Sequence, residues 1–251
     1  LAKALSSKES RPVSLFDFSA LPVAANLTAI VYILIGMAVL AVVETVIPLR
    51  ARTIWHRKHL APNLALTFIT FAVNLVFNVA LVVTLVWLQA IGFGLLNAVA
   101  LDPWLALAIA VIVLDFATYA AHVAMHEVPA LWRFHRVHHS DPALDVTTTV
   151  RQHPGEGVVR YAFLALFAVA LGASPLAFAV YRIWSALQGL LEHANIRLPL
   201  RLDSALALVI VSPNMHKVHH SRDPRLTDTN YGNLTSLWDR AFFTFTPAHR
   251  G

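Results

Sequence analysis

Histidine is the residue type in this 251-residue chain whose spacing points to chemistry. There are thirteen histidines and no cysteine, and ten of the histidines lie between positions 122 and 220. One pattern is written twice, as HRVHHSDP at 135–142 and as HKVHHSRDP at 216–224. In each copy three histidines are spaced i, i+3, i+4, which on a helix places them within one turn, where they can address two neighbouring metal ions. Neutral imidazole is a good ligand for iron, copper and zinc and a poor one for magnesium or calcium. The pattern therefore predicts a transition-metal site.

Further histidines stand close to these two cassettes in the sequence. His122 and His126 are four residues apart at the end of an apolar stretch, a spacing that stacks both rings on one helix face. His193 ends another apolar stretch, and His153 stands in the sequence QHPGE. For these two single histidines, a hydrogen-bonding role beside the metals or in a loop is the alternative interpretation. The predicted ligand set is His122, His126, His135, His138, His139, His153, His193, His216, His219 and His220.

Ten imidazoles exceed the needs of one metal ion. Zinc takes four ligands and catalytic iron keeps open positions, so two metals with four to five ligands each is the expected arrangement. Acidic and amide side chains nearby are expected to orient the ligands or to offset their charge. These residues are Asp115, Glu156, Glu192 and Asn195, with Asp141 as a further source of negative charge. Pairing with another helix is an equal alternative for Asp115. The three remaining histidines, His56, His59 and His249, are expected on the surface.

Composition indicates the elements that position these residues. The chain is 57% hydrophobic and 13% charged, whereas soluble domains contain about 25% charged residues. Residues 24–46 form an apolar run of roughly 34 Å as a helix, enough for a bilayer core of about 30 Å. Further spans are expected at 63–90, which is long enough to tilt or to form two helices, and at 104–125; residues 158–172 and 175–191 are expected to form a hairpin or re-entrant pair. The predicted fold is therefore an all-α, multi-pass transmembrane bundle of about four membrane-inserted helices or hairpins.

The charged residues predict how the bundle is oriented and what it contacts. The loop after the first span contains Arg50, Arg52, Arg57 and Lys58, whereas residues 91–102 contain no Lys or Arg. By the positive-inside rule the histidine cassettes form a cap on the cytoplasmic side. The net charge of +5 then fits anionic lipid headgroups better than nucleic acid. The arginine-rich composition hints at a bacterial inner membrane. Residues 1–22 are expected to form an arm or a surface helix.

The order of these motifs resembles the fatty acid hydroxylase / sterol desaturase superfamily of integral membrane oxygenases. The resembling segments are DFATYAAHVAMH, LWRFHRVHHSD, HPGE, HAN, SPNMHKVHHSRDP and NYGNLTSLWDRAFFTF, which together cover roughly residues 104–246. The resemblance implies a catalytic region at 104–246 that follows an N-terminal part, 1–103, made of the arm and the first two spans, within one integrated domain. Two positions depart from the family pattern: Val123 stands where many members have Arg, and Gly189 stands where some lipid hydroxylases have a further histidine.

The resemblance also implies an activity. It is O₂-dependent oxidation of a lipid C–H bond at a centre of two iron ions, with zinc as a substitute after overexpression. Hydroxylation is the expected outcome, and desaturation or cleavage of an alkyl ether on the same centre are the alternatives. Outside enzymes, a metal transporter or a zinc-binding structural protein would also use histidine clusters. Without an electron-carrying domain of its own, the chain is expected to use a separate donor, such as a ferredoxin or a cytochrome b5-like protein with its reductase. The arginines expected to dock it, or to bind lipid headgroups, are Arg133, Arg136, Arg151, Arg222 and Arg225.

Two further sets of side chains have alternative interpretations. Asn74 and Asn78 lie one turn apart on the second span and are expected to form a hydrogen-bonding face between helices, or to act as ligands. The aromatic residues of the last hairpin are expected either to line a substrate channel or to face lipid and pack the bundle. These residues are Phe163, Phe167, Phe178 and Trp184.

Overall fold

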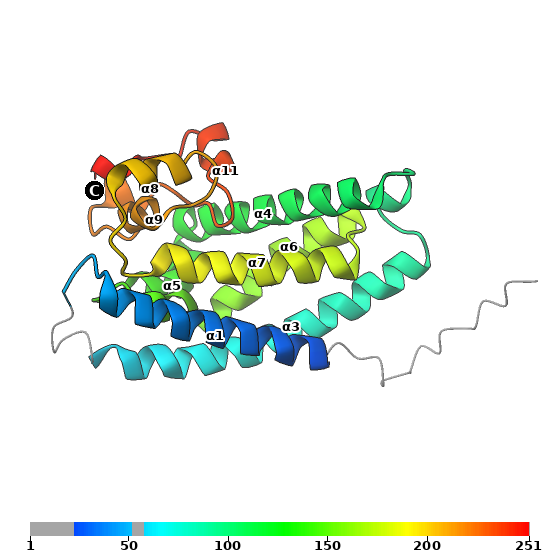
Figure 1. The fold of residues 1–251 in the computed structure, drawn as a ribbon. Helices are drawn as coiled ribbons and strands as arrows, with labels where there is room; N and C mark the ends of the chain where they lie inside the picture. Colours follow the sequence, from blue (N-terminus) through cyan, green and yellow to red (C-terminus); the bar gives the residue numbers. More distant parts are fainter. Residues whose placement is uncertain (1–22, 52–57, 251) are drawn as a thin grey trace, which may run out of the picture.

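The computed structural model describes residues 23–51 and 58–250 (Figure 1). Within these residues the chain is all-helical, and its β contacts are two isolated bridges. Five long helices form the bundle: α1 (Val23–Val46), α3 (Leu60–Ala90), α4 (Pro103–Glu127), α6 (Pro154–Leu171) and α7 (Pro175–His193). The shorter elements are η2 (Leu95–Asn97), α5 (Pro129–His139), η3 (Val146–Val150), α8 (Leu200–Leu206), α9 (Pro213–His219), α10 (Pro224–Thr227), α11 (Leu237–Ala241) and η4 (Ala248–Arg250). The N-terminal arm and His56 fall outside the described residues.

Four helical segments are long and apolar enough to cross a membrane. They are Leu27–Val46, Leu60–Asn97, Pro103–Glu127 and Pro154–Leu171. The apolar side chains of α1 at Val31, Ile35, Val39 and Val42 are exposed, as expected for a helix face in contact with lipid. Residues 60–90 form one continuous helix, so of the two possibilities for this long run the structure has the single helix. The predicted multi-pass helical bundle is thus confirmed.

Helices α6 and α7 form the expected hairpin. They run antiparallel in Figure 1, and both pack against α4. Helix α6 begins at Pro154, four residues before the predicted start, and is long enough to cross a bilayer. Helix α7 is more polar than α6, because it contains Arg182, Gln188 and Glu192.

Local sequence signals determine where the helices begin. Helices α4, α5, α6, α7, α9 and α10 each have a proline in the first turn, where its missing N–H costs no hydrogen bond. Side-chain caps precede several of these prolines. The Asp102 carboxylate accepts hydrogen bonds from the backbone N–H groups of Trp104 and Leu105, and the Ser174 and Ser212 hydroxyls cap α7 and α9. These caps fix the register of the helices that carry the histidines.

A close contact between glycines holds the hairpin in place. Gly172 ends α6 in the left-handed conformation, with φ of 69°. A Cβ atom at Gly94 would lie 2.3 Å from the Gly172 Cα, so the α3–α4 connection and the α6–α7 turn touch through backbone. Helices α3, α4, α6 and α7 share one hydrophobic core, which includes Leu85, Leu114 and Leu164.

The opposite end of the bundle contains the predicted histidine ligands. The C-terminal ends of α4 and α7 reach this end, and the short helices α5, α8, α9 and α11 cap it (Figure 1). The expectation of a surface position for His59 was wrong. His59 is 4% exposed, and its Nδ1 lies 2.9 Å from the Asp141 carboxylate, to which Asn63 also donates a hydrogen bond. Asp141 therefore ties the loop after α5 to the start of α3. His249 is exposed, as expected.

Candidate metal centre

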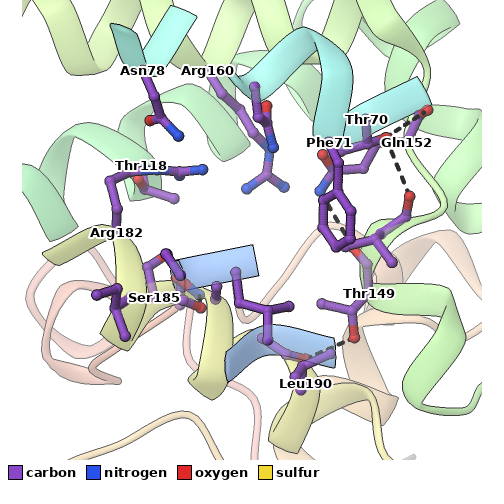
Figure 2. A pocket seen from close by; sticks show the side chains of 18 of the residues that line it. Thr70, Phe71, Asn78, Thr118, Thr149, Gln152, Arg160, Arg182, Ser185 and Leu190 are labelled. Atoms are coloured by element: carbon purple, nitrogen blue, oxygen red, sulfur yellow. Dashed lines mark hydrogen bonds between the residues drawn. The ribbon is translucent and has the colours of Figure 1, made fainter. Parts of the chain in front are cut away.

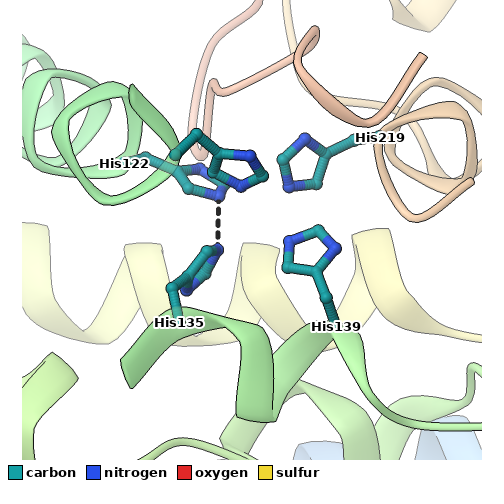
Figure 3. Close-up of side chains that lie close together, drawn as sticks. His122, His135, His139 and His219 are labelled. Carbon is teal, nitrogen blue, oxygen red and sulfur yellow. Dashed lines mark hydrogen bonds between the residues drawn. The ribbon is translucent and has the colours of Figure 1, made fainter. Parts of the chain in front are cut away.

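Nine of the ten predicted histidine ligands converge at the capped end of the bundle. They come from the end of α4, from α5, from the last residue of α7, and from α9 with its C-cap residue His220. They form two groups, and within each group the candidate ligand atoms lie within 4.8 Å of one another. The first histidine group is His122, His126, His135, His139 and His219; the second histidine group is His138, His193, His216 and His220. Four rings of the first group face a common space in Figure 3. The structure therefore has two groups of histidines able to hold metal ions, with five and four possible ligands.

Each sequence cassette divides its histidines between the two groups. On α5, His135 and His139 are four residues apart and belong to the first group, while His138 belongs to the second. On α9 the assignment is reversed, because His219 joins the first group while His216 and His220 join the second. The rings of His139 and His220 stack with centroids 4.4 Å apart, so the groups are adjacent. The repetition thus has a geometric reason, since each copy gives an i, i+4 pair to one group and a single histidine to the other.

Four of the nine imidazoles are oriented by a hydrogen bond at Nδ1. The acceptors are the carbonyl oxygens of Tyr231 for His122 (2.8 Å), Thr229 for His219 (2.7 Å) and Gly189 for His193 (2.7 Å), and the carboxylate of Asp228 for His126 (3.0 Å). Carbonyl and carboxylate oxygens accept, so Nδ1 carries the proton in each ring. Nε2 then presents a lone pair, which is how metal-binding histidines are usually held.

Several Nε2 atoms of the two histidine groups approach one another closely. Nε2 of His193 lies 3.0 Å from Nε2 of His138 and of His216, and the Nε2 atoms of His122 and His135 are also 3.0 Å apart (Figure 3). In the latter pair His122 Nδ1 donates to the Tyr231 carbonyl, so the Nε2 of His122 presents a lone pair toward His135. Two metal–nitrogen bonds of about 2.1 Å at right angles separate their nitrogens by about 3.0 Å. The geometry therefore fits a shared cation.

Buried atoms without a partner support the same fit. Nε2 of His126, His139 and His219 is buried and has no hydrogen-bond partner among the described residues. All three atoms belong to the first histidine group. A buried polar atom without a partner costs free energy, which a bound metal ion would offset.

The histidines of the cap are held neutral, the form that binds metals. Burial away from water lowers the pKa of His138, His216 and His220 well below the usual range, and repulsion among neighbouring imidazoles lowers it further. The same two causes, burial first, lower the pKa of His135 and His139. At neutral pH these rings need lose no proton before they ligate.

His153 lies outside both histidine groups. Its Nδ1 accepts a hydrogen bond from the backbone N–H of Gly155 at 3.0 Å, and its ring stacks on Phe134. It is the N-cap of α6. The proline that follows it begins the helix.

The four residues expected around the ligands lie in different places. Glu156 contacts His135, and the Oε1 atom of Glu192 lies 3.7 Å from His193 Nδ1. Asp115 contacts no histidine among the described residues. It accepts hydrogen bonds from the backbone of Leu234 and from the side chains of Thr235 and Trp238, so it holds the C-terminal segment, as the alternative interpretation had it. Asn195 pairs with the backbone of Arg50 and also lies away from the histidines.

The segment 228–231 is the part of the site that sequence reasoning missed. It supplies the Nδ1 acceptors of His122, His126 and His219. Asn230 adopts a positive φ of 58°, which asparagine tolerates, and its side chain is tied to the backbone of Met215 and Thr246. The sequence signal was the turn-forming run TDTNYGN, but two of the three acceptors are backbone carbonyls, which no residue type reveals.

A cavity of about 430 Å³ leads from the histidines into the bundle between α1, α3, α6 and α7. Its lining includes His122 of the first group and His138, His193 and His216 of the second. Apolar side chains such as Ile33, Phe71, Leu176 and Ile183 line much of the remainder. Of the four aromatic residues considered as channel walls, Phe178 lines the cavity, and Trp184 is half-exposed on the outside of α7.

The sequence profile of the family described as "Fatty acid hydroxylase" matches residues 107–244, more than half of the chain and the part that carries all nine clustered histidines. The chain belongs to the fatty acid hydroxylase family. No solved structure matches it.

Known relatives of this fatty acid hydroxylase family member act on lipids, according to their names. It is 33% identical over 133 residues to an alkylglycerol monooxygenase of Caenorhabditis elegans, a match that covers 52% of this chain and 25% of the relative. It is 34% identical over 134 residues to the ornithine lipid hydroxylase OlsE of Rhizobium tropici, covering 53% and 40%. It is 32% identical over 160 residues to the fatty acid hydroxylase vlmA of Lecanicillium sp, covering 56% and 42%. The matched region is less than half of each relative.

Proposed function

We propose that residues 104–246 form the catalytic region of a membrane-bound di-iron oxygenase that hydroxylates a C–H bond of a lipid, using O₂ and electrons from a separate donor. The observation that carries the proposal is the pair of adjacent histidine groups, members of which line a cavity shared with the membrane-spanning helices. Family membership and the names of the relatives support lipid oxidation as the reaction class.

Iron fits the ligand chemistry. A set of neutral imidazoles suits iron, copper or zinc, and of these iron is the one that activates O₂ for C–H oxidation in this family. The ligands proposed are the nine residues of the two histidine groups. When bound, a reduced iron pair supplies the activation of O₂ that no side chain provides.

The chain's own residues perform the positioning. The Nδ1 acceptors at 228–231 and the Gly189 carbonyl fix the ring orientations, and the cavity brings an alkyl chain to the ligands from the side of the bilayer core. The apolar side chains among the cavity walls suit contact with an alkyl chain. Because both groups lie at the end of the bundle rather than across it, this arrangement does not favour transport, for which ligands are placed near mid-membrane.

An alkyl-ether monooxygenase is the second candidate, because several relatives are named alkylglycerol monooxygenases. The same centre would oxidise the carbon next to the ether oxygen. Both reactions require the same metals and the same cavity, so the substrate alone separates them.

The electron donor is proposed to dock on the cytoplasmic face of the cap. Arg133, Arg136 and Arg222 are exposed there and suit an acidic carrier such as a ferredoxin or a cytochrome b5-like protein. Arg151, which was expected in this set, serves the fold instead, since its guanidinium donates to Asn63 and to the Val137 carbonyl. A bacterial inner membrane remains the proposed location.

Metal analysis of the purified chain followed by an oxidation assay tests the proposal. Close to two metal equivalents per chain, and transfer of oxygen from isotopically labelled O₂ into a lipid, are expected after reconstitution with iron and a donor. Retention of fewer than two metals under iron-replete conditions would contradict the centre. Two metals without labelled product on acyl, alkyl-ether or sterol-like lipids would contradict the reaction.

A further inference from the structure

Two arginines project into the cavity from neighbouring helices. Arg160 comes from α6 and Arg182 from α7, and both line the cavity. Figure 2 shows their guanidinium groups reaching into the same interior space as the side chain of Asn78 on α3. A cation at membrane depth is costly, so it is expected to have a partner.

The partners described for the two arginines differ. The Nε atom of Arg160 donates to Glu156 at 2.9 Å, but its terminal nitrogens have no hydrogen bond among the described residues. Among the described residues, no carboxylate lies within 4 Å of the Arg182 guanidinium, and the buried Nε of Arg182 has no hydrogen-bond partner. Its guanidinium lies 5.1 Å from the ring centroid of Tyr161 and interacts with the hydroxyl of the same residue, so its described partner is a neutral side chain and not an anion.

Asn78 is oriented so that it adds a donor to this space. The Tyr161 hydroxyl donates to Asn78 Oδ1, the helix–helix hydrogen bond expected for this residue. With Oδ1 occupied, the amide Nδ2 is the group left to the cavity, toward which it points in Figure 2. Two guanidinium groups and one amide N–H₂ thus face one space, and all of them are donors.

The position of Arg182 along α7 sets its distance from the proposed metal ligands. Arg182 precedes His193 by eleven residues, roughly 16 Å along the helix axis. Both residues line the same cavity, as do Ser185 and Gly189 between them on the same helix face. A group bound at Arg182 is therefore held away from the histidines but within one continuous space.

We propose that Arg182, with Arg160 and Asn78, binds an oxyanion carried by the substrate, so that the enzyme selects a single-chain lipid with a carboxylate or phosphate group distant from the oxidised carbon. The proposal rests on the proposed function, because it treats the cavity as the substrate site. Guanidinium groups bind both oxyanions through paired N–H donors, and the cavity volume is in the range that holds one small amphiphile.

Binding of matched probes to the metal-loaded full chain in neutral detergent tests the proposal. The probes share one hexadecyl chain length and differ in the head: hexadecanoate, hexadecyl phosphate and hexadecylglycerol. We expect at least one acid to bind roughly tenfold or more tightly than the neutral ether by calorimetry. The preferred acid then tells a carboxylate substrate from a phosphate one. Equal binding of all three probes by the native chain would overturn the proposal.

Variants assign the preference to the residue. Arg182→Gln is expected to abolish it while the neutral ether binds as before, and Arg182→Lys, which also serves if the glutamine variant fails to fold, is expected to retain part of it. Arg201→Gln, at an exposed position of α8, is the matched control and should keep the full preference. Loss of the preference in the control, or its persistence in Arg182→Gln, would refute the assignment. Metal content and labelled-oxygen transfer are measured separately, so failure of the oxygenase proposal leaves the binding result readable.

Discussion

Replacing His193 by alanine tests the division of the histidines most directly. Its Nε2 lies 3.0 Å from Nε2 of His138, 3.0 Å from that of His216 and 3.2 Å from that of His220, so it contacts every other member of the second histidine group. His193→Ala leaves this group three imidazoles, whereas the first group keeps its five. The expected result is loss of one of two bound metals.

The magnitude follows from the ligand count. Four-ligand zinc sites bind with roughly 10–16 kcal/mol, so one ligand of four accounts for about 3 kcal/mol, or about two orders of magnitude in affinity. A chelator competition set between the two affinities should therefore remove one metal from the variant and none from the native chain. Atomic absorption after such a competition gives the stoichiometry, and circular dichroism checks the fold.

His153→Ala is the matched control, because it removes a histidine from the same end of the bundle but from outside both groups. It should keep two metals and lose only a helix cap, about 1 kcal/mol of stability. Two metals of native affinity in His193→Ala would refute the grouping, and so would loss of a metal from His153→Ala equal to that from His193→Ala.

Three further predictions follow from the contacts of the site and the hairpin. Glu156→Gln, which removes the carboxylate 3.2 Å from His135 Nδ1, should weaken metal binding to the first histidine group by roughly 10- to 100-fold in a chelator titration and leave the second group unchanged; equal weakening of both groups would contradict the contact. Gly172→Ala should lower the free energy of unfolding by about 1–3 kcal/mol, because the residue has φ of 69° and its Cβ would lie 2.5 Å from the Phe93 carbonyl oxygen. A calorimetric scan of the variant that matches the native chain would contradict this. The metal-free chain should lose stability as the pH falls from about 7.5 through 6, because the unfolded chain protonates its histidines near pH 6.5 while burial keeps the folded pKa of the cap histidines well below that value. Melting curves that stay level from pH 7.5 to 5.5 would contradict that burial.

Much of the architecture could be predicted from the sequence because the relevant signals are local. Apolar runs of bilayer length identified α1, α3 and α4, and the prolines at 103 and 175 marked helix starts. The i, i+3, i+4 spacing placed the cassette histidines on one helix turn, and the number of imidazoles indicated two metals. Such properties depend on helix geometry and ligand chemistry, which act within a few residues.

Tertiary packing decided which of these faces meet. Spacing alone does not tell that His138 joins His216 while His139 joins His219, since that depends on how α5 and α9 are rotated against each other. His153 and His193 looked alike as single histidines, yet one caps a helix and the other is central to the second group. Two of the Nδ1 acceptors at 228–231 are backbone carbonyls, which cannot be predicted from the type of side chain.

The cavity arginines show the same limit. Arg160 and Arg182 are twenty-two residues apart on different helices, and they face one space only because the turn at Gly172 folds α7 back along α6. The sequence by itself determined that the chain has membrane-spanning helices and histidines suited to transition metals, because hydropathy and imidazole chemistry are properties of single residues and single helices. The partition of the ligands, their orientation and the charged interior of the cavity were decided only when the helices packed, because each requires atoms from segments far apart in the chain.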